Sequence, residues 1–160
     1  MNVPKTEQKQ VFLKSYSQIV ALAEALKIVR QLDLNQMSVS VIGNLGEDYI
    51  NDDSGLTTVT DELQLFFKGI LGGSTDFDTF YNPELGRLFV VGFLVSTFKN
   101  TVGKRAIGVL SGGPYGILRG LGVKEAEAVS SVKKLNDGTY LLVARGDRRT
   151  IDKLQKELTN

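Results

Sequence analysis

The side chains that most often carry enzyme chemistry are missing from this sequence. Its 160 residues include no His and no Cys, which excludes a Ser-His-Asp triad, a Cys-His dyad and a zinc site with His or Cys ligands. Carboxylates remain, and Asp76, Asp78 and Glu84 are close enough in sequence to form an oxygen-only Mg²⁺ or Ca²⁺ site. No EF-hand pattern surrounds them, so we expect no catalytic residue, no metal and no cofactor.

A glycine-rich stretch offers backbone N–H groups that could bind an anion. Neither a Walker A loop nor a Rossmann Gly-x-Gly-x-x-Gly motif is present. Ser111-Gly112-Gly113 could still present backbone N–H groups to a phosphate or a nucleotide. The candidate anion site consists of Lys104, Arg105, Ser111, Gly112, Gly113 and Arg119.

Part of the glycine excess is regularly spaced. Four glycines lie four residues apart, at Gly108, Gly112, Gly116 and Gly120. On a helix this spacing makes a flat stripe on which another backbone can pack closely. Pro114 interrupts the stripe, and a proline inside a helix costs about 3 kcal/mol. We therefore expect a break at 111–113, a new turn starting at Pro114, and a glycine-rich hairpin packed within the chain or on another copy.

The segment 10–46 has the pattern of a strand, a helix and a second strand. Apolar residues at 11–13 predict the first strand. A helix follows over 16–34, because apolar residues recur there at spacings of three and four. Residues 37–42 alternate between apolar and polar, which is typical of a strand. The default for such a βαβ unit is a right-handed crossover.

The segment 122–160 repeats these patterns. It predicts a helix over 123–135, an apolar strand over 139–144 and a last helix that Asp147 caps. The region between the two segments is less regular. We expect a short helix over 61–71 and a loop over 73–86 there.

Two interpretations remain open for the middle of the chain. Residues 88–92 form a third strand, or the middle is purely helical and the sheet has three strands. With the extra strand, the order of elements is that of a split β-α-β fold. We therefore predict a single α+β domain over 1–160. Segments 10–46 and 122–160 would form a ferredoxin-like βαβ…αβα frame, and 47–121 a long glycine-rich helical insertion.

The charges are segregated along the chain. Residues 47–84 contain nine acids and one base, whereas residues 85–124 contain six bases and no acid. These blocks either neutralise each other within one fold or face a partner or ligand. The net charge is only +1, which argues against a dedicated nucleic-acid binder.

The uncharged runs at 88–98 and 106–118 are too short to span a membrane, which takes about 20 residues. The start of the chain lacks the apolar core of a signal peptide. We therefore expect a cytoplasmic protein without a transmembrane span. Contact with a membrane surface through the basic block stays open.

Four motifs carry a resemblance to a known family. They are MSVSVIGN (37–44), YNPELGRLFVVG (81–92), IGVLSGGPYGILRGLG (107–122) and GVKEAEAVSSVKKLNDGTYLLVARG (122–146). In these the chain resembles small bacterial general-stress and heat-induced stress proteins with a glycine-rich centre, a family of unknown function. Lys124 stands where that family often has Pro. The resemblance implies a bacterial origin and a stress-linked role, and it brings no site residues.

Together these observations favour a non-enzymatic interaction or self-assembly module. Exposed sheet edges and the glycine stripe favour a homo-oligomer. The alternative is a protein that binds a small ligand or an anion, such as phosphate or a nucleotide, through the basic glycine-rich segment 103–120.

Overall fold

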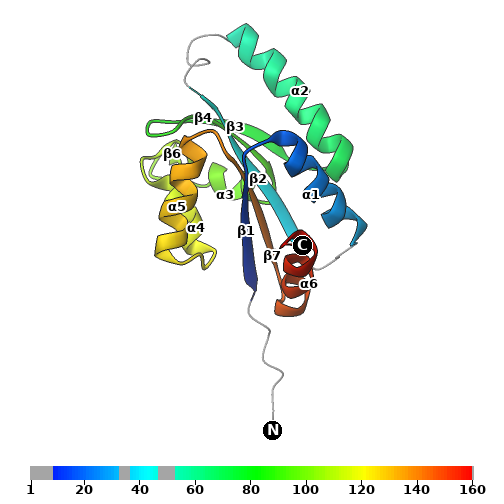
Figure 1. Ribbon diagram of the computed structural model, residues 1–160. Helices are drawn as coiled ribbons and strands as arrows, with labels where there is room; N and C mark the ends of the chain where they lie inside the picture. Colours follow the sequence, from blue (N-terminus) through cyan, green and yellow to red (C-terminus); the bar gives the residue numbers. More distant parts are fainter. Residues whose placement is uncertain (1–8, 33–36, 47–52, 160) are drawn as a thin grey trace.

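The computed structural model describes residues 9–32, 37–46 and 53–159, and its centre is a five-stranded antiparallel sheet (Figure 1). The strand order is β1-β7-β2-β4-β3. The strands are β1 (Gln10–Tyr16), β2 (Ser38–Gly46), β3 (Phe77–Asn82), β4 (Gly86–Gly92) and β7 (Tyr140–Gly146). A small hairpin of β5 (Thr101–Val102) and β6 (Arg105–Ala106) lies outside this sheet.

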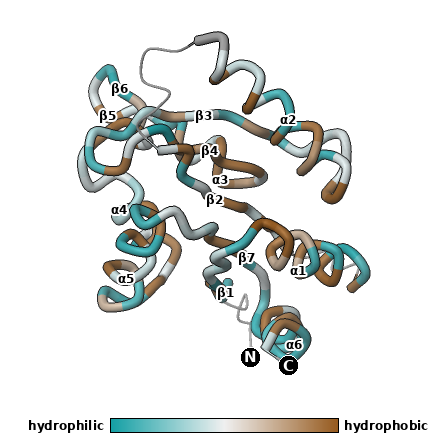
Figure 2. Tube along the Cα trace, turned by 45° about the horizontal axis from the view of Figure 1, so that its top comes forward, coloured by the Kyte–Doolittle hydropathy of each residue, from teal (hydrophilic) through white to brown (hydrophobic). Residues whose placement is uncertain are grey.

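Helices cover both faces of the sheet, so the molecule has three layers (Figure 2). One face carries α1 (Ile19–Gln31), α2 (Asp53–Leu71) and α6 (Arg148–Thr159). The other carries α3 (Leu94–Lys99), the 3₁₀ turn η1 (Ile107–Val109), α4 (Gly113–Gly120) and α5 (Glu125–Asn136). Successive strand residues point to opposite faces, so each face has its own apolar core.

The register of the central strands shows this division. Val41 and Leu142 are paired across β2 and β7, and both pack in the core under α1. Their neighbours Ile42 and Leu141 are also paired, and they pack under α4 and α5. Strands buried on both faces read as continuous apolar runs, as at residues 141–144 of β7.

The patterned helices form where the sequence predicts them. α1 buries its apolar stripe, including Leu22 and Leu26, against the sheet. α5 has Glu125 in its first turn and Lys134 in its last turn, which suits the helix dipole. Asp147 caps α6 by accepting a hydrogen bond from the Thr150 N–H at 2.8 Å. The predicted Asp147 cap is confirmed, as are the helices predicted over 16–34 and 123–135.

The mixed α+β class is confirmed, whereas the ferredoxin-like frame is not. That frame would pair β1 with both β7 and β4. Instead, β1 pairs with β7, and β7 separates it from β2. Helices also lie on both faces of the sheet. The order of strands depends on which faces pack together, and local patterns do not encode it.

The middle of the chain contributes two strands as well as helices. The predicted strand at 88–92 is confirmed as β4, so the three-stranded alternative is wrong. The predicted loop at 73–86 is also wrong, because it contains the edge strand β3. Phe77 of β3 stacks on Phe89 of β4 with ring centroids 6.1 Å apart. This cross-strand aromatic contact stabilises a strand whose own residues alternate poorly.

Candidate functional site

An open apolar cleft lies beside α4, and we call it the α4 cleft. Its volume is about 480 Å³, and residues of α3, β5, η1 and α4 line it. Its lining includes Gly112, Gly116 and Gly120, together with Val102, Ile107 and Leu121. Val102, at the tip of the hairpin, is 60% exposed. Clefts with mainly apolar linings are common binding sites.

The four regularly spaced glycines divide into two kinds. Gly108 lies in the 3₁₀ turn η1, where a Cβ would come within 2.7 Å of the Phe98 ring. At Gly112, Gly116 and Gly120 a Cβ would meet no atom of the described residues within 4 Å. Gly108 is therefore needed for packing inside the chain, whereas the other three glycines border open space.

The predicted helix break is confirmed. Gly112 is the N-cap of α4 and has a φ of 73°, in the left-handed region that favours glycine. Pro114 lies in the first turn of the helix, where a missing N–H costs nothing. The stripe on α4 consequently starts at Gly112 and excludes Gly108.

The chain's own Glu84 occupies the predicted anion cradle. Glu84 Oε1 accepts hydrogen bonds from the Ser111 hydroxyl, at 2.8 Å, and from the Gly112 N–H. The Gly113 N–H donates to the Leu110 carbonyl at 2.9 Å. The cradle therefore binds an anion in the way that the sequence suggests, but the anion is an internal carboxylate.

The cations of the predicted anion site do not gather around this cradle. Arg105 donates to the Val109 carbonyl at 3.4 Å, and Arg119 donates to the Val123 carbonyl at 3.0 Å. Lys104 is exposed at the tip of the hairpin. The structure thus brings Ser111 and Gly112 together and directs both guanidinium groups to backbone carbonyls.

Asn82 positions the wall of the cleft, and sequence reasoning missed it. It is fully buried, and its amide nitrogen donates to the Gly108 and Leu110 carbonyls at 3.0 Å each. Its Oδ1 accepts from the Glu84 N–H at 2.9 Å. The Asn82-Pro83 pair is a turn signal, and it could have indicated a residue that bonds to nearby backbone.

The acidic residues considered for a metal site make separate contacts with different partners. Asp78 forms an ion pair with Lys99 at 3.2 Å, and Glu84 holds the start of α4. Within the described residues, no group of three potential metal ligands from His, Cys, Asp and Glu is found. Asp78 and Glu84 therefore have structural contacts that explain their positions.

No helix in the described part of the chain has both the length and the apolar character needed to cross a membrane. Comparisons of the chain with protein-family models, with curated proteins and with solved structures found no match. The site must therefore be interpreted from its own geometry.

Proposed function

We propose that this protein is a non-enzymatic interaction module that associates with a second copy of itself through the α4 cleft. One observation carries the proposal. Gly112, Gly116 and Gly120 lie along one open side of α4, and a Cβ at any of them would meet no atom of the described part of the chain. Glycine in a helix destabilises it by roughly 0.5–1 kcal/mol relative to alanine. The left-handed φ of Gly112 already favours glycine, whereas a close partner would explain the glycines at Gly116 and Gly120.

A second α4 is the partner that best fits this surface. Glycines spaced four apart let two helix backbones approach closely, provided that both helices carry small residues at the contact. In a two-fold dimer each copy presents the same patch. The glycine stripe on α4 of one copy then packs against the same stripe of the other copy, and no other protein is needed.

Charge favours an antiparallel arrangement of the two helices. Glu84 is bound at the start of α4, and Arg119 lies in its last turn, about 10 Å further along the helix. An antiparallel pair brings Glu84 of one copy toward Arg119 of the other, twice. A parallel pair would place Arg119 against Arg119, which is unfavourable.

Light scattering over a range of protein concentrations tests the proposal. The wild type is expected to form a dimer, and Gly116→Leu should weaken it by about tenfold or more, because the leucine would hold the backbones apart. The matched control is Gly69→Leu, at an exposed glycine of α2 whose Cβ would also meet nothing. A wild type that stays monomeric at high concentration overturns the proposal, as does equal weakening by both variants.

The anion-binding alternative has one specific observation in its favour, the contact of Glu84 with Ser111 and Gly112. An external anion would have to replace this carboxylate. Phosphate or a nucleotide should then raise the melting temperature of Glu84→Gln more than that of the wild type. An equal or absent shift in both proteins would exclude this binding mode.

The cellular setting that we propose rests on the sequence. The resemblance to bacterial stress proteins supports a stress-linked role. A cytoplasmic location is the second part of this proposed setting. Expression of the protein during heat or salt stress would test the first point.

A further inference from the structure

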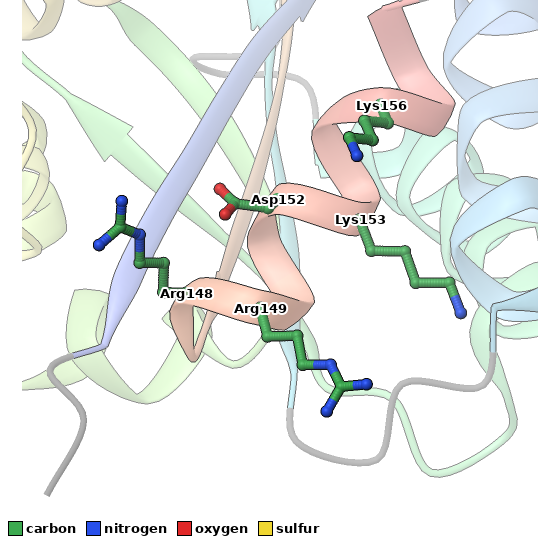
Figure 3. A pocket seen from close by; sticks show the side chains of 5 residues that line it. All are labelled: Arg148, Arg149, Asp152, Lys153 and Lys156. Carbon is green, nitrogen blue, oxygen red and sulfur yellow. The ribbon is translucent and has the colours of Figure 1, made fainter.

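A second surface of the molecule concentrates positive charge on the exposed side of α6, and we call it the α6 basic face. It consists of Arg148, Arg149, Lys153 and Lys156, with Asp152 among them. These five residues line an open hollow of about 440 Å³ (Figure 3). The α6 basic face lies on the opposite side of the sheet from the α4 cleft.

The pattern of α6 produces this face. Ile151, Leu154 and Leu158 are buried against the sheet, so the residues between them must face outward. Among the described residues, no hydrogen bond or ion pair engages the four cations. They are therefore available to a ligand.

Lys9 adds a further charge close to the start of α6. The pKa of Asp147 is lowered mainly by hydrogen bonds from Thr150, and also by the nearby charges of Lys9 and Arg149. Lys9, just before β1, and Arg149 are thus both near enough to Asp147 for their charges to act on its carboxylate. The positive surface extends beyond α6 itself.

The arrangement of these side chains indicates the class of ligand. In Figure 3, Arg148 points to one side of α6 while Arg149 and Lys153 point to the other. They do not converge on one point, so a single small anion would contact only some of them. A chain of phosphates can contact all of them in turn. The axial distance from Arg149 to Lys153 is about 6 Å, which is similar to the spacing of phosphates along a nucleic-acid strand.

We propose that the α6 basic face binds the sugar-phosphate backbone of a nucleic acid without reading its sequence. Among the residues that the structure describes, its lining has no aromatic side chain to stack on bases and no apolar side chain to enter a lipid layer. The net charge of +1 conceals this surface, because the acidic block at 47–84 offsets it.

Fluorescence anisotropy with a short labelled DNA duplex at low salt tests the proposal. The double variant Arg149→Ala/Lys153→Ala should weaken binding about tenfold and reduce the slope of log affinity against log salt by about two. Asp152→Asn should tighten binding about twofold, because it removes a negative charge from the surface. This opposite effect keeps the test decisive if the double variant folds poorly.

The matched control removes two exposed lysines from α5, as Lys133→Ala/Lys134→Ala. It changes the net charge equally but on the opposite side of the sheet, so binding should change by less than about twofold. Equal weakening by both double variants overturns the proposal. So does a wild type that fails to bind the duplex, or that binds phosphatidylserine vesicles and not the duplex.

Discussion

At the scale of single residues, Asn82 connects the β3–β4 turn to the wall of the α4 cleft. Asn82→Ala would leave the buried Gly108 carbonyl without this donor, and the half-buried Leu110 carbonyl with only the Gly113 N–H. We expect the free energy of unfolding to fall by about 2–3 kcal/mol, measured by urea denaturation. Asn136→Ala, at an exposed position that ends α5, is the control and should change stability little. A small effect at Asn82 would contradict the role assigned to it.

Two glycines should respond to alanine in opposite directions. A Cβ at Gly43 would lie 2.2 Å from the Phe89 ring, so Gly43→Ala should destabilise the fold by about 1–3 kcal/mol. The alanine in Gly116→Ala meets no atom of the described residues and gains helix propensity, so under monomeric conditions it should stabilise α4 by up to about 1 kcal/mol. Thermal melts of both variants check this, and a loss of stability at Gly116 would show hidden contacts.

Asp147 makes stability depend on pH. Hydrogen bonds from Thr150 lower the pKa of its carboxyl in the folded protein, so the charged form stabilises the fold. This contribution is complete above the unfolded pKa, near 4, and is lost as the pH falls through the lower folded value. Asp147→Asn keeps a capping side chain without the charge. The wild type should melt higher than this variant at pH 6, and the gap should close in acid; a constant gap would contradict the assignment.

At the scale of elements, strong local patterns predict helices and strands well. α1, α5, β2 and β7 follow from periodicity because each buries a continuous apolar surface. β3 is less predictable, since it is an edge strand that includes Asp78 and Asn82. Its pairing with β4 depends on contacts that form only in the folded sheet.

The candidate site also contains some features set by neighbouring residues and others set by residues far apart in the sequence. The break before Pro114 and the capping glycine are local, and the sequence predicts them. The contact of Glu84 with Ser111 and Gly112 joins residues far apart in the chain. The spacing of residues identifies hydroxyl and N–H groups that could donate hydrogen bonds to an anion. It cannot show that a carboxylate of the same chain already accepts these bonds.

At the scale of the whole molecule, the two proposed surfaces lie on opposite faces of the sheet. Mutations more than about 7–10 Å apart without shared partners usually have additive effects. Changes in the α4 cleft should therefore leave the α6 basic face unaffected, and each proposal can fail without the other. A dimer joined through α4 would also present two α6 basic faces, which would strengthen binding to one long polyanion.

The most direct test of the central claim uses a single cysteine in a chain that has none. Gly116 is the middle glycine of the stripe, so in an antiparallel pair it lies nearest the two-fold axis. Two copies of Gly116→Cys should then come within the Cα separation of about 4.4–6.8 Å that a disulfide requires. Mild oxidation followed by non-reducing electrophoresis should give a covalent dimer of Gly116→Cys and little of the control Gly69→Cys. No dimer at Gly116, or equal dimer at both positions, would contradict association through the α4 cleft.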